Sequence, residues 1–488
     1  MRPESLRAGR RWAALLLLST LLVEGGFVLA ADQTGAAHTL RILNSRLQRN
    51  KDHLERSASR LSLTEALARG LTANPVLAQA FARTEATSWT GVAIRKEWIP
   101  SLTAGNNSPG LVGVQQQQAD TFSLSSPQVE LEWTFFDPSR RPRAEANAAG
   151  LAADRFLLDV EARTLVLTIP QHYIDLQALL ELEKDYQALG ELAGSWRELA
   201  KAKWRRGTSI PDVDQLTSEE LALMILRVQT HEQVIVAAAK LARSLSLPPG
   251  ELMMPSERLG LKGTWPLGRQ ETIDQALRFR EEIQQSLAKA RSLGWQAVAT
   301  RKGYLPTLAV GGYGSTQGTS DNAGLQSEGA VGVNVTWTLF DGGLLAAQAN
   351  AQRKQQDQAL QQAALDRLDV TAEVETSHAA YVSSRILVDA ALAQVESARA
   401  SILTSSRGFA EGRSDATTLV QVLNTLRGAQ EAYIQAVQKH NRSVAALYRE
   451  SARWPDTAEA LLQRRLSHLR SGAASTGGWT TRSGHRAP

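Results

Sequence analysis

The chain has 488 residues, of which 43% are hydrophobic and 21% charged, a balance typical of folded domains and not of a disordered chain. It contains no cysteine, which excludes disulfides, thiolate metal sites and a catalytic cysteine, and we expect no lipid anchor on an N-terminal cysteine. The formal net charge of +5 is partly concentrated near the two ends, so the basic balance does not indicate a nucleic-acid partner.

The N-terminus predicts a secretory signal. Several arginines precede an apolar run at residues 12–23, and residues 28–30 have the pattern that a signal peptidase reads. Glu24 ends the run before the roughly twenty apolar residues that a membrane anchor requires. We therefore expect residues 1–30 to be a cleaved signal. A polar extension follows at residues 31–60, and its pattern assigns no firm structure.

A helix-start signal opens the next part of the chain. Ser62, with Glu65 three residues later, has the pattern of a capping box and predicts a helix that continues to about residue 98. Asn74 and Pro75 should interrupt or kink this helix, because proline lacks the backbone donor and restricts the residue before it.

Two segments predict a strand followed by a long helix. Residues 331–339 alternate apolar with small or polar side chains, and residues 129–135 alternate apolar with polar ones, so each predicts a strand with two chemically different faces. Asp341 and Asp137 follow the strands as candidate N-caps, and Pro138 suits the first position of a helix.

Each strand-to-helix junction belongs to a larger layout that occurs twice. An extended segment before each junction predicts a β-hairpin with a long polar loop. The junctions lead into long segments of helical composition, each able to extend about 95 Å, although Pro170 should kink or divide the first. A returning helix follows each of them. The predicted helices are residues 142–206 and 212–247 in the first copy, and 344–407 and 417–453 in the second.

Matched landmarks in the two copies lie about 205 residues apart, for example Pro100 and Pro306, or Asp137 and Asp341. This constant spacing indicates an internal duplication. We expect repeat 1 at residues 61–255, repeat 2 at residues 256–455, and a basic tail at residues 456–488 that is predicted to be disordered.

Two strands per copy give four per chain, too few to close a barrel around a lumen. An open sheet edge cannot face lipid, so the missing strands would come from further copies of the chain. A homotrimer supplies twelve strands and closes by cyclic symmetry. A soluble sandwich with one buried face fits the alternation equally well. In the barrel, the residues expected to face lipid or its aromatic girdles are Trp133, Val333, Val335, Trp337 and Leu339. Those expected to face the lumen are Glu130, Glu132, Asn334 and Thr336.

The ordered motifs resemble those of the TolC-like outer-membrane efflux family over about residues 61–453. The resemblance rests on the duplicated layout, on the L-T-E-A-L segment at residues 63–67 with the Asn-Pro pair after it, on the W-T-L-F-D-G-G segment at residues 337–343, and on helix ends with an aromatic residue three before a glycine. It implies an α+β membrane protein, with a trimeric twelve-stranded barrel in the outer membrane of a Gram-negative cell and a coiled-coil α-helical barrel in the periplasm.

The resemblance also implies a gate where helical hairpins close the periplasmic end. The candidate gate residues are Asp212, Phe409, Arg413, Asp415, Gln421 and Asn424. Gln421 and Asn424 stand where the best-known member has cation-binding aspartates, so their neutral amides put cation block in doubt. Arg413 is a candidate charged partner of Asp212. Helix capping and ordinary surface positions are the alternative interpretation of these residues.

An enzyme is disfavoured, because the sequence has none of the usual hydrolase, zinc or phosphate-binding motifs, and we expect no cofactor or metal. A periplasmic adaptor would pair one helical hairpin with a β-rich half, whereas this chain has two of each. The expected function is an exit duct of type I protein secretion, working with a periplasmic adaptor and an ABC transporter, with a repeat-rich toxin as one candidate cargo. The alternative is small-molecule efflux with a proton-driven pump.

Overall fold

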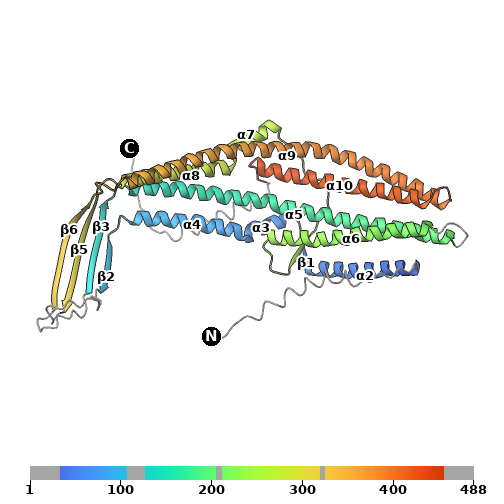
Figure 1. Cartoon of the computed structure of the whole chain (residues 1–488), viewed down its shortest axis with the longest axis horizontal. Coiled ribbons are helices and arrows are strands. Elements are labelled where there is room, and N and C mark those ends of the chain that lie inside the picture. The colour runs from blue at the N-terminus through green and yellow to red at the C-terminus, as the bar shows by residue number, and fades with distance from the viewer. Residues whose placement is uncertain (1–32, 107–126, 205–210, 319–324, 455–488) are drawn as a thin grey trace, which may run out of the picture. The chain divides into compact units, whose positions relative to one another are not determined.

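The computed structural model describes residues 33–106, 127–204, 211–318 and 325–454, so the predicted signal and the whole predicted tail lie outside the described residues. Within them, an order of two helices, two strands, a long helix and a returning helix occurs twice (Figure 1). The first copy consists of α3 (Leu63–Ala73), α4 (Pro75–Lys96), β2 (Ser101–Asn106), β3 (Pro127–Phe136), α5 (Arg140–Trp204) and α6 (Pro211–Ser244). The second consists of α7 (Arg269–Phe279), α8 (Glu281–Lys302), β5 (Thr307–Gly318), β6 (Leu325–Thr336), α9 (Leu344–Ala410) and α10 (Ala416–Glu450).

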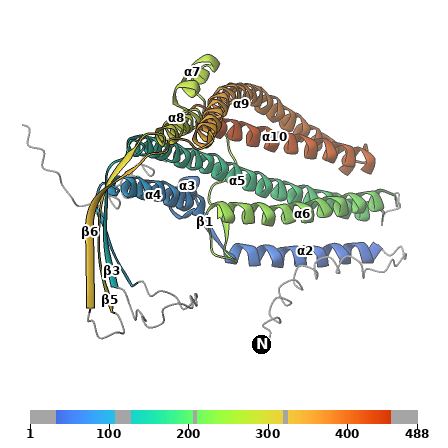
Figure 2. The ribbon, with the colours of Figure 1, turned by 60° about the vertical axis from the view of Figure 1, so that its left-hand side comes forward.

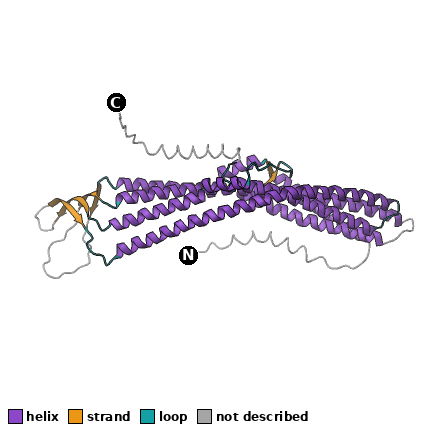
Figure 3. Ribbon diagram, turned by 90° about the horizontal axis from the view of Figure 1, so that it is seen from above, coloured by secondary structure: helices purple, strands orange, loops and turns teal. Residues whose placement is uncertain are grey.

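The chain divides into two compact units. The first comprises Met1–Arg56, Lys184–Gln229 and Arg399–Arg427, and therefore contains the adjoining ends of α5, α6, α9 and α10. The second comprises the remaining residues and contains the strands together with the other parts of the four long helices. Helices dominate the described residues (Figure 3), and none of these helices has a stretch long and apolar enough to cross a membrane.

Four strands form one antiparallel sheet in the order β2-β3-β5-β6, with the central β3–β5 pair joining the two copies (Figure 2). The pairing register places Leu131 opposite both Leu102 and Gly312, and Gly312 opposite Val331. Directly opposed residues share a face, so apolar side chains from both copies lie on one side of the sheet. The two expected β-hairpins are thus present.

The strand-to-helix junctions differ in detail from the expectation. Strand β6 ends at Thr336, so Trp337 and Leu339 lie after it and not on its apolar face. The indole of Trp337 donates instead to the carbonyl of Tyr304 at 3.0 Å, which holds the side chain at the base of the hairpin. Pro138 lies in a turn before α5, which begins only at Arg140.

Asp341 stabilises the start of α9 from three residues upstream. Its carboxylate accepts hydrogen bonds from the amides of Gly343 and Leu345, both at 2.8 Å. Gly342 and Gly343 have φ angles of 68° and 86°, a left-handed conformation that glycine adopts without strain. The D-G-G sequence therefore forms a tight turn whose aspartate satisfies helix amides, although not as the residue adjacent to the helix.

The capping box predicted at the start of α3 is present. The Ser62 hydroxyl accepts from the amide of Glu65, and the Glu65 carboxylate accepts from the amide of Ser62 at 2.8 Å. Asn74 separates α3 from α4 and caps the second helix through a 2.8 Å hydrogen bond from the amide of Val76. Its amide group also donates to the carbonyl of Ser244 at 3.0 Å, so this interruption is fastened to the end of α6.

Helix α5 continues through Pro170 and is not divided there. Neighbouring side chains hold this stretch in place: Ile169 and Tyr173 are completely buried, and the Tyr173 hydroxyl donates to the carbonyl of Leu61 at 3.0 Å. Leu61 belongs to β1 (Ala58–Leu61), which pairs in parallel with β4 (Leu252–Pro255). Tertiary packing therefore compensates for the backbone hydrogen bond that the proline cannot make.

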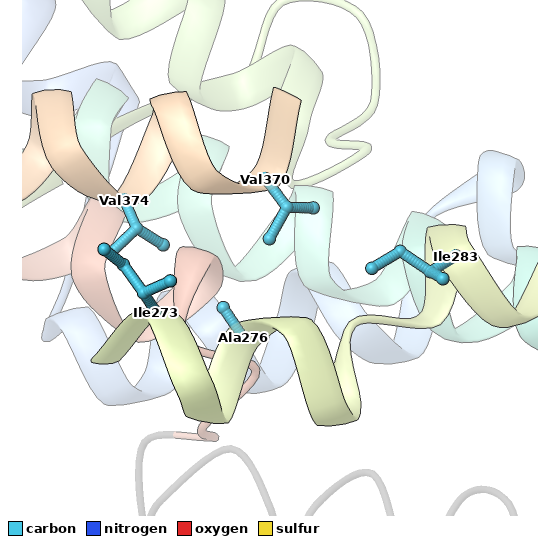
Figure 4. Close-up of a cluster of buried hydrophobic side chains, with 5 residues drawn as sticks. All are labelled: Ile273, Ala276, Ile283, Val370 and Val374. Atoms are coloured by element: carbon cyan, nitrogen blue, oxygen red, sulfur yellow. The ribbon is translucent and has the colours of Figure 1, made fainter. Parts of the chain in front are cut away.

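The second copy has its own small core. Ile273 and Ala276 on α7 face Val370 and Val374 on α9, with Ile283 of α8 beside them (Figure 4). All five side chains are at least 94% buried. Burial of each isoleucine or valine contributes about 1.5–3 kcal/mol, and this packing anchors the short α7 to the long α9.

The polar extension is helical, contrary to the absence of firm structure expected from its composition. Helix α2 spans Gln33–Ser57, and its leucines Leu40, Leu47 and Leu54 are 3%, 4% and 6% exposed. These leucines recur every seven residues, a pattern that brings them to one face of a helix. Most of the residues between these leucines are polar, so composition alone does not indicate that the segment has an apolar face.

A buried charge cluster joins α8, α9 and α10 inside the second unit. Arg280 contacts Glu282 at 2.9 Å, Glu373 at 3.0 Å and Glu450 at 2.5 Å. Arg449 contacts Glu373 and Glu450, both at 3.0 Å. Two cations therefore face three carboxylates. Burial, followed by the hydrogen bond with Glu373, raises the pKa of Glu450 to about 7.

This cluster predicts a pH-dependent stability that Glu450→Gln should remove. A carboxyl whose pKa is higher in the folded than in the unfolded chain binds more protons when folded, so the free energy of unfolding falls as pH rises from about 4.5 to about 7. A difference of one pKa unit between the folded and the unfolded chain corresponds to about 1.4 kcal/mol, so we expect a loss of about 1–3 kcal/mol across this window.

The measurement is the thermal unfolding midpoint between pH 5 and pH 8. The midpoint of the E450Q variant should decline less with pH than that of the parent chain. Glu375→Gln, at an exposed carboxylate two residues from Glu373, is the matched control and should follow the parent. Parallel curves for E450Q and the parent would contradict the assignment.

Candidate functional site: the helical hairpin ends and the strand faces

The turn between α9 and α10 is built by a glycine in the left-handed conformation. Gly412 has a φ of 79°, and its amide donates to the carbonyl of Phe409 at 3.1 Å. The amide of Arg413 donates to the carbonyl of Gly408 at 2.7 Å. These bonds satisfy carbonyls at the end of α9, which explains why a helix of this kind ends with a glycine just after its last turn.

Phe409 is a packing residue at this helix end. Its side chain is 1% exposed, and the ammonium group of Lys203 lies 4.2 Å from the centre of its ring. The same ammonium group donates to the carbonyl of Phe409. Lys203 lies in the last turn of α5, where a basic residue commonly pairs with carbonyls of its own helix end. Here the carbonyl belongs to α9, so the local sequence pattern does not identify this contact.

Asp415 is the N-cap of α10. Its carboxylate accepts hydrogen bonds from the Thr418 hydroxyl at 2.7 Å and from the Thr418 amide at 2.9 Å. These two bonds hold the pKa of Asp415 below its usual range. The capping alternative therefore accounts for Asp415 without a further role.

Asp212 connects the starts of α6 and α10. Its carboxylate accepts from the amide of Ala416, the first residue of α10, at a long 3.4 Å. Three residues after Asp212 on α6, the Gln215 side chain accepts a hydrogen bond from the Thr417 hydroxyl at 3.3 Å. All four residues belong to the first unit, so these two contacts join the turn ends of the two helical hairpins within it.

Arg413 is not the charged partner of Asp212 in this structure. It forms an ion pair with Glu411 inside the same turn, where 74% of the Arg413 side chain and 53% of the Glu411 side chain are exposed. A two-residue separation allows the guanidinium to reach Glu411 without leaving solvent. The backbone amide of Ala416 takes the place that the sequence analysis gave to the arginine.

Gln421 and Asn424 lie one turn apart on α10. Gln421 is exposed, whereas Asn424 is half-buried and its side-chain carbonyl accepts from Arg427 Nε at 3.2 Å. The opposite side of the helix carries Leu419 and Leu423, both completely buried. The helix therefore presents uncharged amides on the side away from its core.

The two faces of the sheet carry different side chains, as the alternation predicts. Glu130 lies opposite Thr103 on one neighbouring strand and opposite Tyr313 on the other. Ala309 lies between Thr134 and Asn334 in the same way. Since opposed residues share a face, Glu130, Glu132, Asn334 and Thr336 all lie on one side of the sheet. Trp133, Val333 and Val335 lie on the other side.

The apolar side of the sheet is open in the single chain. Val331, Val333 and Val335 on β6 are 84%, 68% and 59% exposed, and Leu102 on β2 is 70% exposed. A row of exposed aliphatic side chains of this length is unusual on the surface of a water-soluble monomer. Strands β2 and β6 are also the two ends of the sheet, each paired on one side only among the described strands.

Residues 272–451, which contain most of the second copy, match the family model described as outer membrane efflux protein. The chain carries an outer membrane efflux protein domain. The resemblance to the TolC-like family that the motifs predict is thereby confirmed, and the matched family has the outer-membrane location predicted for this chain.

A curated relative of this chain is Protein CyaE of Bordetella pertussis, which is 27% identical over 181 residues. The alignment covers 36% of this chain and 38% of that relative, so it spans well under half the length of either protein.

Two solved structures share the fold over about four-fifths of this chain. The CmeC outer membrane channel of Campylobacter jejuni has a TM-score of 0.70 at 14% identity, over 83% of this chain and 89% of that one. The outer membrane protein VceC of Vibrio cholerae has a TM-score of 0.66 at 15% identity, over 80% of this chain and 95% of that one. The largely helical architecture with few strands is thus that of outer-membrane channels.

Proposed function

We propose that this chain is the outer-membrane exit duct of a type I protein secretion system. Three copies would pair their sheets into a twelve-stranded barrel in the outer membrane, and their long helices would form a coiled-coil barrel in the periplasm. A periplasmic adaptor and an inner-membrane ABC transporter would deliver an unfolded polypeptide to it. The duct itself would carry out no chemistry.

The open four-stranded sheet is the observation that carries this proposal. It has an exposed apolar face and a polar face, and its two edges, β2 and β6, are unpaired among the strands that the structure describes. Pairing β6 of one copy with β2 of the next would satisfy both edges, and lipid would cover the valines. Cyclic repetition closes such a head-to-tail contact into a ring.

The gate proposal rests on the contacts between α6 and α10. The bonds of Asp212 with Ala416 and of Gln215 with Thr417 are two weak contacts between separate hairpins. Opening would require the hairpins to move apart and break them, as expected for a resting state that a partner shifts. The Asp415 cap lies within α10 and would persist in both states.

The polypeptide cargo is supported by the neutral side chains at the candidate constriction. Gln421 and Asn424 offer amides that donate and accept hydrogen bonds and carry no charge. An unfolded chain brings groups of both signs through the same opening, so a neutral polar lining suits it better than a ring of carboxylates.

Small-molecule efflux with a proton-driven pump is the second candidate, and the description of the matched family as an efflux protein favours it. A gene deletion separates the two. Loss of one polypeptide from the culture medium, with unchanged drug susceptibility, supports secretion, whereas the reverse result supports efflux.

The test of the channel itself is the mass and conductance of the protein extracted from outer membranes. We expect a trimer with a small but finite single-channel conductance in planar bilayers. A monomer without conductance would contradict the proposal, since the exposed valines would then require a different partner.

The same recordings test the gate. Asp212→Ala removes the acceptor for the Ala416 amide, so we expect the resting conductance to rise severalfold. Arg413→Ala is the control, because its ion pair with Glu411 is exposed and confined to one turn, and such pairs contribute little. Equal conductance of the D212A variant and the parent chain would show that Asp212 does not hold the gate closed.

A further inference from the structure

Helix α2 is fixed to the first unit by its leucine face. Leu40 and Leu47 pack with Met224 of α6, and Leu43 and Leu221 lie beside them. Arg227 of α6 donates to the side chain of Asn44 at 3.0 Å. Each well-buried leucine contributes about 1.5–3 kcal/mol, so α2 is held as an added helix of this hairpin.

The apolar surface of α6 on which α2 packs has no equivalent in repeat 2. When the two repeats are aligned so that Asp212 corresponds to Asp415, Leu216 corresponds to Leu419. Both leucines are completely buried, so the cores of the two hairpins are equivalent. In the same alignment, Leu221 corresponds to Asn424 and Met224 corresponds to Arg427. The positions that α2 covers are therefore apolar in repeat 1 and polar in repeat 2.

The face of α2 opposite the leucines carries a second regular stripe. Its members are Ile42, Arg46, Arg49, His53 and Arg56, at alternating intervals of four and three residues. All five are exposed. Because 3.6 residues make one turn, this spacing follows a single line along the helix, as the contact seam of a coiled coil does.

The arginines of the stripe have guanidinium groups available for a partner. Nε of Arg49 donates to the carbonyl of Ser45 at 3.2 Å, and Nε of Arg56 to the carbonyl of Asp52 at 3.0 Å. The Asp52 carboxylate accepts from Gln48 at 2.9 Å. Among the described residues, none of the three stripe arginines has a carboxylate within ion-pair distance.

The composition of the stripe favours carboxylates as its ligands. Three of its five members are arginines, whose planar guanidinium binds a carboxylate through two parallel hydrogen bonds. Residues on any one face of an α-helix follow this spacing, so the guanidinium groups, and not the spacing, indicate the ligand. A helix lying along α2 would present its own side chains at the same intervals.

We propose that this arginine stripe binds an acidic helix of a partner protein, with carboxylates at four-and-three spacing. This inference rests on the proposed function only for the identity of the partner, which would be the helical hairpin of the periplasmic adaptor. The stripe would add an electrostatic contact on repeat 1 that the polar surface of repeat 2 lacks.

The test uses the full-length protein in detergent and two synthetic 21-residue helices of identical composition. One peptide carries glutamates at four-and-three spacing, and the other has them scattered around the helix. Binding is measured by fluorescence anisotropy. The parent protein should bind the striped peptide at least tenfold more tightly, and added salt should weaken that binding because it screens exposed charges.

Two matched charge reversals decide whether the stripe is responsible. Arg49→Glu with Arg56→Glu should reduce the affinity for the striped peptide at least tenfold. Arg41→Glu with Arg60→Glu makes the same change of charge at exposed arginines outside the stripe, and should reduce it less than threefold. The milder Arg49→Gln with Arg56→Gln should still weaken binding, and circular dichroism confirms that each variant is folded.

Three results would overturn the inference. Equal losses in both reversed variants would mean attraction to net charge alone. Binding to phosphatidylglycerol vesicles that the R49E/R56E variant loses, without preference for the striped peptide, would make a lipid surface the occupant. Dissociation of the oligomer in that variant would make the stripe a contact between copies of this chain.

Failure of the channel function is a separate outcome. If the parent protein has no conductance but still prefers the striped peptide, the stripe binds acidic helices as proposed. Only the identification of the partner as a periplasmic adaptor is then wrong. If the inference holds in full, cells with the R49E/R56E variant should export at least fivefold less cargo, while the single-channel conductance remains that of the parent.

Discussion

Chains in which lysine replaces both Val333 and Val335 are expected to disappear from the outer membrane. Chains with lysine at Asn334 and Thr336 are expected to assemble there and conduct. The four positions alternate along β6, and the register with β5 places the two pairs on opposite faces. A lysine on the lipid face of a barrel costs about 2–4 kcal/mol near the bilayer midplane. Two in every chain would therefore cost about 4–8 kcal/mol, a large part of the roughly 5–15 kcal/mol by which a domain is stable.

The measurement is the amount of trimer in purified outer membranes, followed by conductance of whatever assembles. The Asn334 and Thr336 variants serve as the matched control, because they add the same charge one residue away and leave the apolar face intact. If both pairs assemble equally well, the valine face does not contact lipid and packs against protein instead. If both pairs fail, the whole strand is intolerant of charge and the facing assignment is wrong.

The second large effect is expected from tying the two hairpins together. The parent chain has no cysteine, so Gln215→Cys with Thr417→Cys introduces the only two thiols. The native side chains at these positions are in contact, 3.3 Å apart at the nearest polar atoms. A short cleavable cross-linker between the two thiols should reduce cargo export at least tenfold, because the starts of α6 and α10 could no longer separate. Cleaving the linker should restore export.

A linker confined to one hairpin is the control. Glu411→Cys with Arg413→Cys joins two residues that already form an ion pair within a single turn, so it should leave export nearly unchanged. Normal export by the Q215C/T417C variant in its cross-linked form would show that the α6–α10 contact does not open during transport.

The helices and their ends were largely readable from local patterns. The Ser62–Glu65 capping box, the interruption at Asn74 and the turn at Gly412 all have a local physical cause, and each is where the pattern places it. Such features depend on hydrogen bonds between residues a few positions apart, so no tertiary contact is needed to anticipate them.

The candidate gate was predicted less completely. The family resemblance singles out Asp212 as a gate candidate with Arg413 as its partner, but the Asp212 carboxylate accepts from the backbone of Ala416 and not from Arg413. Lys203 was missed because its contact is with Phe409, more than two hundred residues away in sequence. Which of several nearby charges forms a pair depends on distances that the sequence does not contain.

The sequence by itself determined the duplicated layout, the two-faced strands and the breaks between helices, because periodicity and capping act within a few residues. The tertiary structure decided that Pro170 lies in one continuous helix, that α2 is a helix with a seat on α6, and that Arg280 and Glu450 share a buried cluster. These outcomes depend on which distant surfaces meet, and only packing in three dimensions selects among them.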